Sequence, residues 1–363
     1  MKKLSLIIPL YNEETLIKEI VEKTLELKKY LKDVVLELVI VDDASSDNSL
    51  KAAQELENEE IKVYHHEINQ GKGAALKTGF KYATGDFIGI QDADLEYNPL
   101  DYIKLLEPLL EDKADVSYGS RYLTRSSRRV LYFWHTFMNR SLTLLTNMYT
   151  NLDITDMETC YKLFKKEVIK EILPKLKENR FGFEPEVTVN VALGRYRVWE
   201  CAISYNPRSY EEGKKIKAKD GLRAIYCILH YGADCAPLPM QFLLYLFIGG
   251  LSALVNILVF MLLIKFLGLG VSVGIAFVIS AIVNYLLCIA LLFKHKARWS
   301  SLGEIFAYIL ILIIMGLLDW GVTYLLLAVH FNNFFAKATS SLIGVVGNFL
   351  FRKYFVFGFL KKK

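Results

Sequence analysis

Four long apolar segments close the chain, and they restrict its fold more than any other feature of the sequence. They cover, approximately, residues 241–264, 271–293, 302–329 and 334–357. Each reaches the roughly 20 residues that a helix needs to cross about 30 Å of hydrocarbon. The alternative, core helices of a soluble domain, does not suit four such segments in succession. We therefore expect residues 241–363 to form an all-α, four-helix transmembrane domain in a lipid bilayer.

The charged residues divide the chain at the same place. From Gln241 onward there are 10 Lys or Arg and 2 Asp or Glu residues, whereas residues 1–240 hold 34 basic and 37 acidic ones. The first part therefore has no basic excess with which to bind a phosphate backbone, which argues against a nucleic-acid partner. The apolar segments exclude a purely soluble or disordered protein. Five cysteines without a CxxC spacing predict neither a disulfide framework nor a structural zinc site.

The basic residues of the last part predict its orientation. Lys294, Lys296 and Arg298 lie between the second and third apolar segments, and three lysines end the chain. Because cytoplasmic loops are enriched in Lys and Arg, we expect a multi-pass protein of the cytoplasmic membrane, with residues 1–240 and both termini in the cytoplasm. A short similarity between residues 284–287 (NYLL) and 348–351 (NFLF) indicates that a pair of helices is repeated.

Residues 1–120 alternate short apolar runs with stretches of helical periodicity. The predicted strands are Leu4–Pro9, Leu36–Val41, Ile61–His65, Phe87–Gln91 and Asp115–Tyr118, and the predicted helices are 14–31, 49–56, 73–83 and 100–110. This alternation is typical of an α/β fold with a mostly parallel sheet covered on both faces. Ligands of such sheets bind beyond the carboxyl ends of the strands. The polar residues that follow the strands are therefore the candidates for chemistry.

Two further helices are predicted between this region and the apolar segments. Residues 131–148 are apolar and aromatic at helical spacing. Residues 221–231 are amphipathic, which suits a helix at the membrane surface as well as an ordinary packing helix. We treat 221–240 as an interfacial helix and linker.

Two carboxylates follow the fourth predicted strand, in Asp92-Ala93-Asp94. Together they suit one hard divalent cation, which can neutralise nucleotide phosphates and a leaving diphosphate. Alone, this pattern is more often a solvated turn. Asp42 and Asp43 end the second strand and are placed to accept hydrogen bonds from a base or ribose, although residues 45–47 also suit a helix N-cap.

Gly71-Lys72-Gly73 precedes a predicted helix and would lie near a phosphate. It lacks the full Walker A spacing, so it does not predict a P-loop ATPase. The histidines show no metal-ligand spacing, and we expect His65 and His66 to be exposed.

Taken together and in order, four motifs resemble the family 2 glycosyltransferases with the GT-A fold. They are IIPLYNEE, VDDASSDNS, NQGKGAALKTGF and IQDADLEYNP. The continuation through GSR (119–121), TDMETCYK (155–162), FEPE (183–186) and NPR (206–208) resembles polyprenyl-phosphate sugar synthases such as dolichyl-phosphate mannose synthase. The four-segment part resembles GtrA-like membrane domains. The resemblance implies a cytosolic GT-A domain over residues 1–220, with a Rossmann-like nucleotide-sugar-binding sheet, joined to a GtrA-like domain over 241–363.

The resemblance also implies roles for matching positions. The residues implied to bind the nucleotide-sugar are Pro9, Tyr11, Glu13, Asp42, Asp43, Lys72 and Asp92. Those implied to hold Mg²⁺ or Mn²⁺ are Asp92, Asp94 and Glu96, where Glu96 replaces the glutamine common in mannose synthases. Those implied to bind the acceptor phosphate are Arg121, Arg140 and Arg208, with Arg129 and Lys214 as further candidates. Asp92, Asp94, Arg121 and Asp156 are implied to be catalytic, while Asp156 also suits the N-cap of a helix over residues 160–164.

The implied reaction is a metal-dependent, inverting transfer of a hexose from GDP-mannose or UDP-glucose to a polyprenyl or dolichyl phosphate. A phosphate monoester has a second pKa near 6, so this acceptor is already nucleophilic at neutral pH. The site must then supply positioning and charge neutralisation rather than a strong base. Two alternatives stay open. One is a processive polysaccharide or glycolipid synthase, although the QxxRW motif of such enzymes is absent. In the other, the membrane part is a flippase or transport partner for the lipid-linked sugar. A homo-oligomer is compatible with each.

Overall fold

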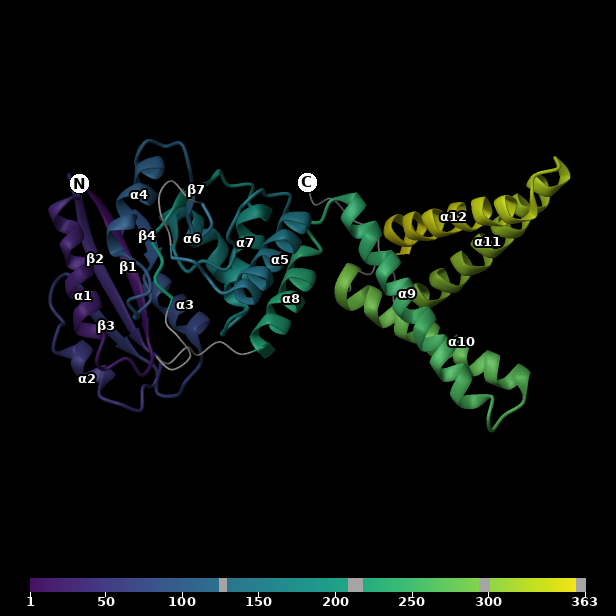
Figure 1. Ribbon diagram of the computed structural model, residues 1–363, viewed down its shortest axis with the longest axis horizontal. Coiled ribbons are helices and arrows are strands. Elements are labelled where there is room, and N and C mark those ends of the chain that lie inside the picture. Colours follow the sequence, from purple (N-terminus) through teal and green to yellow (C-terminus); the bar gives the residue numbers. More distant parts are fainter. Residues whose placement is uncertain (124–128, 208–217, 294–300, 357–363) are drawn as a thin grey trace. The chain divides into compact units, whose positions relative to one another are not determined.

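The computed structural model divides the chain into two compact units, Met1–Pro237 and Leu238–Lys363 (Figure 1). It describes residues 1–123, 129–207, 218–293 and 301–356. The first unit is an α/β domain. In the described part of the second unit, every element is helical.

A seven-stranded sheet forms the centre of the first unit, with the order β3-β2-β1-β4-β6-β5-β7. The strands are β1 (Lys2–Leu10), β2 (Val34–Asp42), β3 (Ile61–His65), β4 (Phe87–Ile90), β5 (Val116–Ser120), β6 (Lys162–Lys165) and β7 (Val198–Ala202). Pairings between these strands are parallel except those that β6 makes with β4 and β5. The prediction of a mostly parallel sheet is therefore confirmed.

The central strands are buried because their side chains are apolar on both faces. Leu6 in β1 pairs with Leu38 of β2 on one side and with Gly89 of β4 on the other, and it is completely buried. Near-continuous apolar strands of this kind are typical of parallel sheets covered by helices. The chain turns back between β3 and β4, so β1 and β4 flank the point at which the strand order reverses. Ligands of open α/β sheets bind at such points.

Strand β6 corrects one expectation. The helix considered over residues 160–164 is wrong, because Lys162–Lys165 form a strand inserted between β4 and β5. Asp156 consequently does not cap a helix there. Since β6 runs antiparallel to its neighbours, its amino end lies where their carboxyl ends lie. The segment that precedes β6 therefore reaches the same edge of the sheet as the loops after β1, β2 and β4.

Helices flank this sheet (Figure 1). They are α1 (Ile17–Leu25), α2 (Ser49–Gln54), α3 (Lys72–Tyr82), α4 (Tyr102–Leu110), α5 (Phe133–Thr150), α6 (Lys166–Ile172), α7 (Phe183–Leu193) and α8 (Ala218–Gly232), with short 3₁₀ turns at 26–29, 99–101 and 173–175. The four helices predicted before residue 120 are all present, and the first is shorter than expected. Helix α8 packs against α5 and α7 through Ala224, Cys227 and Ile228, while Leu222 is exposed. Packing thus explains its inner face, and contact of its outer face with a membrane stays a prediction.

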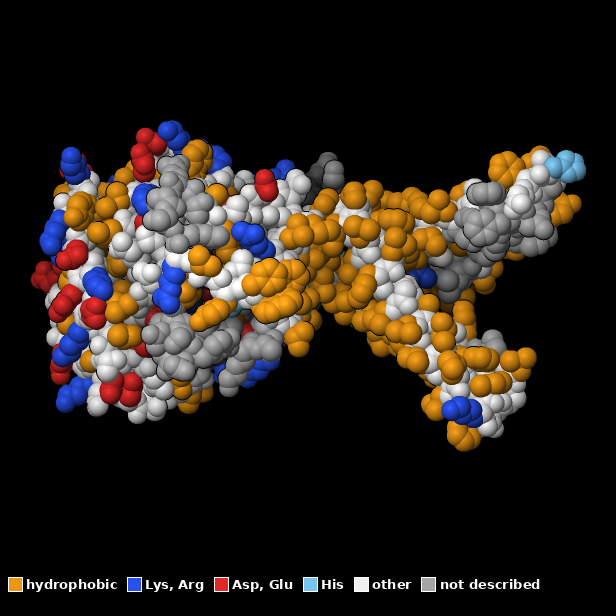
Figure 2. Space-filling view, viewed as in Figure 1, with side chains coloured by type: hydrophobic (Ala, Val, Ile, Leu, Met, Phe, Trp, Pro, Cys, Tyr) orange, Lys and Arg blue, Asp and Glu red, His pale blue; other side chains and the backbone are white. Residues whose placement is uncertain are grey.

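The second unit contains a helix for each of the four apolar segments. They are α9 (Leu238–Leu263), α10 (Leu269–Leu287), α11 (Ser301–Ala328) and α12 (Asn333–Phe351). Helices α10 and α12 each continue into a π-helical stretch, over Cys288–Phe293 and Arg352–Val356. Within the described residues, 238–263 and 274–292 are long and apolar enough to cross a membrane. Figure 2 shows hydrophobic side chains over most of the described surface of this unit that is visible, whereas charged side chains are scattered among other kinds over the first.

Candidate active site

The loops after β1 and β2 are bound to each other at the carboxyl edge of the sheet. The backbone N–H of Asn12 donates to Ser45 Oγ (3.0 Å), and that of Ser46 donates to Asn12 Oδ1 (2.8 Å). Asn12 and Ala44 both have positive φ angles, 51° and 58°. Such conformations persist only where surrounding contacts hold them, and they are frequent at functional sites. The edge beside β1 is therefore a fixed surface that exposes Tyr11.

Asp43 organises the next loop from within. It is buried, and its carboxylate accepts hydrogen bonds from the backbone N–H groups of Gln70 (2.9 Å) and Gly71 (2.7 Å). His66 Nδ1 lies 2.7 Å from Asp43 Oδ1. The expectation of an exposed His66 is thus wrong, whereas His65 is exposed. The Asp43 oxygens hold the loop that precedes α3.

Asp42 has one unused oxygen. Its Oδ2 accepts a hydrogen bond from the backbone N–H of Ser45 (3.1 Å), but its Oδ1 is buried without a partner among the described residues. Buried polar atoms in native proteins are nearly always paired. This Asp42 oxygen at the carboxyl end of β2 therefore suits a ligand that donates a hydrogen bond, such as a nucleobase.

The two glycines around Lys72 serve close packing. Gly71 has φ 102°, and a Cβ there would lie 2.4 Å from the carbonyl oxygen of Asn179. A Cβ at Gly73 would lie 2.9 Å from backbone atoms of Glu178 and Asn179. Only glycine allows the start of α3 to approach that segment so closely. The packing orients Lys72 at the first position of α3.

Lys72 meets the first aspartate of the DAD sequence. Its Nζ lies 2.8 Å from Asp92 Oδ1 and 3.6 Å from Glu184 Oε1, with Cys160 Sγ also at 3.6 Å. Burial lowers the pKa of Lys72, but the Asp92 carboxylate, the Cys160 thiol and the Glu184 carboxylate outweigh this and raise the pKa well above its ordinary value. A fixed positive charge therefore lies against the carboxylates that follow β4.

The other two acids of this loop have different neighbours. Asp94 Oδ1 accepts a hydrogen bond from the backbone N–H of Glu96 (3.2 Å), and Glu96 Oε2 accepts one from the hydroxyl of Tyr205 (2.8 Å). The described residues contain no group of three or more His, Cys, Asp and Glu side chains that would hold a metal by themselves. Mg²⁺ is commonly bound by one or two carboxylates plus substrate phosphates. Asp92 and Asp94 fit that donor set, because each supplies a carboxylate in the short segment that follows β4.

Arg121 and Asp156 form the second charged centre. Arg121 Nε donates to Asp156 Oδ2 (2.7 Å), and Nη2 donates to Asp156 Oδ1 (2.8 Å). Both side chains are buried. Glu200 of β7 accepts the backbone N–H groups of Thr155 (2.9 Å) and Asp156 (3.1 Å) and fixes this loop from the other side. The pair fastens the carboxyl end of β5 to the segment that leads into β6.

Glu158 lies behind these two centres. Its Oε1 is enclosed without a partner among the described residues. Burial, with a further contribution from the Glu184 carboxylate, raises the pKa of Glu158 to about 7. Nearby, Lys162 is completely buried and donates to the carbonyl oxygens of Met157 (2.8 Å) and Thr159, and burial lowers its pKa. Burial that shifts the pKa values of neighbouring ionisable groups in this way is typical of functional sites.

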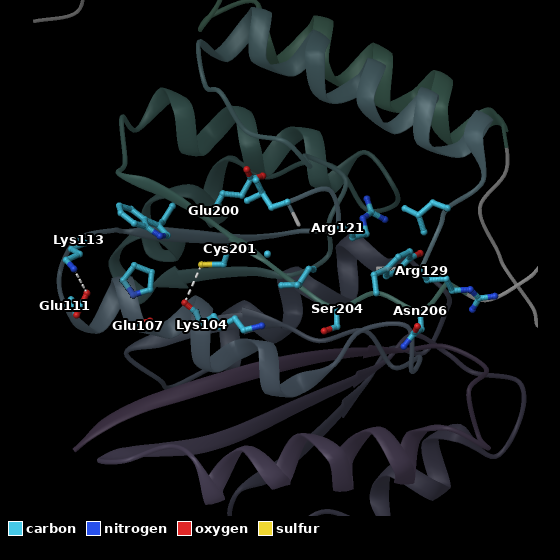
Figure 3. A pocket seen from close by; sticks show the side chains of 17 residues that line it. Lys104, Glu107, Glu111, Lys113, Arg121, Arg129, Glu200, Cys201, Ser204 and Asn206 are labelled. Carbon is cyan, nitrogen blue, oxygen red and sulfur yellow. Dashed lines mark hydrogen bonds and ion pairs between the residues drawn. The ribbon is translucent and has the colours of Figure 1, made fainter. Parts of the chain in front are cut away.

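A cavity of about 490 Å³ runs along β7 from Arg121 (Figure 3). Arg121 and Arg129 lie at one end of it, and Glu111 and Lys113 lie at the other. Arg121 stacks over the rings of Tyr205 (5.2 Å) and Tyr122 (5.8 Å). This cavity places a guanidinium group beside space that an anionic ligand can enter.

The structure brings most of the predicted site residues to one edge. Pro9, Tyr11, Glu13, Asp42, Asp43, Lys72, Asp92, Asp94, Glu96, Arg121 and Asp156 lie in or next to the segments described above. Arg140 of α5 also contacts the Tyr122 ring (5.3 Å). Arg129 Nη1 donates to the carbonyl oxygen of Pro207 (3.2 Å). Arg208 and Lys214 lie outside the described residues.

Sequence reasoning missed His66, Glu184, Glu200 and Tyr205 as parts of this site. Each of them acts through a partner that is distant in the sequence. The FEPE sequence that contains Glu184 resembled the synthases, and it was the one available signal.

Comparison with known proteins identifies the family of each unit. Residues 5–173 match the model of glycosyl transferase family 2, and residues 244–357 match that of the GtrA/DPMS transmembrane domain. A UDP-N-acetylglucosamine–dolichyl-phosphate N-acetylglucosaminyltransferase of Methanococcus voltae is 27% identical over 245 residues, which are 63% of this chain and 95% of that protein. Glycosyltransferase AglD of Haloferax volcanii is 25% identical over 214 residues, which are 57% of this chain and 33% of AglD. A mycobacterial protein of known crystal structure has the same fold, with a TM-score of 0.50 and 19% identity over 65% of this chain and 76% of that one.

The mostly parallel sheet, its acidic carboxyl edge and the family match define a glycosyltransferase of the GT-A fold. Its first unit carries a glycosyltransferase family 2 domain, and its second unit is a GtrA/DPMS transmembrane domain. The protein is therefore a membrane-associated family 2 glycosyltransferase.

Proposed function

We propose that the protein transfers one sugar from a nucleotide-sugar to a polyprenyl or dolichyl phosphate and inverts the anomeric carbon. The observation that carries the proposal is the pair of charged centres at one sheet edge, Asp92 with Lys72 and Arg121 with Asp156. The first suits the diphosphate of a donor and the second lies beside a cavity for an anionic acceptor. The relative from Methanococcus voltae, which matches along nearly its whole length, supports this acceptor class by its name.

The donor diphosphate would lie between the β1 and β4 loops. Asp42 would accept a hydrogen bond from the base, and Lys72 would neutralise phosphate charge. Asp92 and Asp94, with Glu96 as a further candidate, would hold Mg²⁺ or Mn²⁺, which would neutralise the charge that develops on the leaving nucleoside diphosphate.

The acceptor phosphate would enter beside Arg121. One of its oxygens attacks the anomeric carbon and forms a new C–O bond, while the bond to the nucleoside diphosphate breaks and its electron pair leaves with the diphosphate. The dianionic phosphate needs no strong base. Arg121 would hold it in line, and Arg140, Arg129, Arg208 and Lys214 would extend the positive surface. Asp156 would orient Arg121 through the two hydrogen bonds that its carboxylate accepts from the guanidinium.

The donor is one of three nucleotide-sugars. GDP-mannose and UDP-glucose follow from the family resemblance, and UDP-N-acetylglucosamine follows from the named relative. We further infer that residues 1–220 form the catalytic domain, that 221–240 connect it to the membrane domain, and that the catalytic domain faces the cytoplasm. The basic residues at 294–298 and 361–363 support this orientation.

A panel of radiolabelled donors tests the proposal. The purified full-length protein is incubated with UDP-N-acetylglucosamine, UDP-glucose or GDP-mannose, with Mn²⁺ and with one prenyl phosphate. We expect one donor to label a lipid that carries a single sugar. The matched control replaces the prenyl phosphate by the prenyl alcohol and should give no labelled lipid. A polymeric product would favour the processive synthase instead, and labelling of the alcohol would contradict a phosphate acceptor.

A further inference from the structure

The membrane unit contains a polar cluster to which α9, α10, α11 and the π-helical stretch after α12 contribute. Asn284 of α10 is its centre: its Oδ1 accepts hydrogen bonds from Arg352 Nη1 (2.8 Å) and Tyr308 Oη (3.2 Å), and its Nδ2 donates to Ser252 Oγ (3.2 Å). Ser252 lies on α9, Tyr308 on α11, and Arg352 follows α12. Polar side chains inside a transmembrane domain are rare and mark binding sites or pathways.

Arg352 supplies the positive charge of this cluster. The residue is 4% exposed, and its guanidinium lies 4.3 Å from the ring centroid of Tyr308 and 5.7 Å from that of Tyr245. Its Nε is buried without a hydrogen-bond acceptor among the described residues. Among the side chains that the structure describes, no carboxylate pairs with Arg352. A buried cation needs a counter-charge, and two aromatic faces supply only part of it.

The helix geometry changes at the same place. Asn284 and Asn348 each lie one turn before a π-helical stretch, which begins at Cys288 in one helix pair and at Arg352 in the other. This agrees with the repeat suggested by NYLL and NFLF. Asn348 Oδ1 is also buried, with no partner in the described part of the chain. Single π-helical turns are frequent at functional sites. The two helix pairs thus have similar backbones. They differ in the first residue of the π-helical stretch, which is Cys288 in one pair and Arg352 in the other.

We propose that Arg352, with Tyr308 and Asn284, forms a binding site for the phosphate group of a membrane lipid. An oxyanion would accept the hydrogen bond that Arg352 Nε offers and would balance its charge. A guanidinium group suits phosphate because it offers parallel donors. The ligand is a lipid because the site lies within a transmembrane domain. Its phosphate belongs either to a prenyl phosphate, with or without a sugar, or to an ordinary phospholipid. The site uses none of the proposed catalytic residues and does not depend on the donor.

Lipid retention tests the site in the full-length protein. The protein is reconstituted in phosphatidylcholine nanodiscs that contain prenyl monophosphate, prenyl alcohol or phosphatidylglycerol, and retained lipids are counted by native mass spectrometry. We expect Arg352→Gln to reduce retention of the phosphate lipid at least about tenfold, as loss of a hydrogen bond to a charged group implies. Arg352→Lys should lose less. Lys265→Gln, which removes an exposed positive charge from the same unit, should retain lipid like the wild type.

The other lipids and variants distinguish a prenyl phosphate from a phospholipid and test whether the site exists. Arg352-dependent retention of prenyl phosphate but not phosphatidylglycerol assigns the site to the prenyl lipid, and Arg352-dependent retention of both assigns it to lipid phosphates in general. Equal retention by wild type and both Arg352 variants would overturn the site, as would retention of the alcohol equal to that of the phosphate. Glu304→Gln, which changes an acid four residues before Tyr308, must not reproduce the loss seen in Arg352→Gln.

Glycosyl transfer measured in the same nanodiscs keeps the two proposals distinguishable. Arg352-dependent retention without any sugar transfer to prenyl phosphate would refute the proposed function and leave the site standing. Sugar transfer together with lipid retention that is the same in the wild type and the Arg352 variants would refute the binding site but not the proposed function.

Discussion

Arg121 and Asp156 face each other in a two-point ion pair, with Nε–Oδ2 and Nη2–Oδ1 distances of 2.7 and 2.8 Å, and the backbone N–H of Arg121 adds a third hydrogen bond to the same carboxylate (3.0 Å). Because both side chains are buried, neither charge has an alternative partner in water. The pair therefore sets where the free edge of the Arg121 guanidinium points.

Replacing Asp156 by Asn tests this pair. The change leaves a buried guanidinium without its counter-charge, which costs about 3–5 kcal/mol of stability. We also expect transfer to fall about 100-fold, since a misplacement of about 1 Å can have that effect. Thermal unfolding and initial rates of the full-length protein measure both. Asp153→Asn changes an exposed aspartate of the same loop and should affect neither. Wild-type values in Asp156→Asn would refute the positioning role.

Asp94→Ala tests the metal assignment. Loss of this carboxylate should abolish turnover even at saturating Mn²⁺, because the leaving diphosphate would lack its counter-charge. Chelation by EDTA should abolish the transferase activity of the wild type, and added Mn²⁺ or Mg²⁺ should restore that activity. Glu59→Gln, at an exposed carboxylate, is the matched control and should keep full activity. A variant without Asp94 that still turns over normally would defeat the assignment.

Gly71→Ala probes the packing of α3. The substitution forces a side chain into a φ of 102° and places its Cβ 2.4 Å from the Asn179 carbonyl oxygen, so we expect a loss of about 1–3 kcal/mol or more. Gly221 lies in α8, where a Cβ would have no atom within 4 Å, and alanine there should stabilise the helix by about 1 kcal/mol. Melting temperatures that move in opposite directions would agree with this reasoning. An unchanged or higher value for Gly71→Ala would contradict it.

The raised pKa of Glu158 predicts how the stability of the protein depends on pH. Its pKa is about 7 in the folded protein against an ordinary value of 4.5, so the folded state holds this proton more tightly than the unfolded state. The contribution of Glu158 to the free energy of unfolding is therefore fully present below pH 4.5. It is lost as the pH rises through 7. Glu158→Gln, which resembles the neutral acid, should melt at a higher temperature than the wild type at about pH 8 and at a similar one at about pH 4.5. Parallel melting curves across this range would argue against a raised pKa.

The first four strands and their acids were predictable because each signal is local. Apolar runs set the strands, and topology then carries Tyr11, Asp43 and Asp92 to one edge. Strand β6 was not predictable in this way, since Cys160, Leu163 and Phe164 recur at helical spacing. Only the gap between β4 and β5 makes this segment a strand.

The internal partners of the site were hidden for a related reason. Lys162 is completely buried, whereas a lysine in a sequence predicts a side chain that is exposed to solvent. Its burial becomes reasonable only when the carbonyl groups of Met157 and Thr159 are seen around it. Similarly, the sequence around Glu184 does not predict its contact with Lys72. This contact depends on how the first turns of α7 and α3 meet in the folded domain.

The insertion of β6 also orders events during synthesis. A nascent chain can assemble β1 to β4 before residue 156 has been made, but the turn that holds Lys72 finds its packing partners only when residues 178–184 follow. The acceptor side is completed only when a later segment enters between two strands already formed, a pairing that is slow because its contacts are distant along the chain. Chains that end before residue 156 would lack both the Asp156 partner of Arg121 and the Glu184 contact of Lys72, so we expect neither charged centre to be complete until the whole first unit has been made.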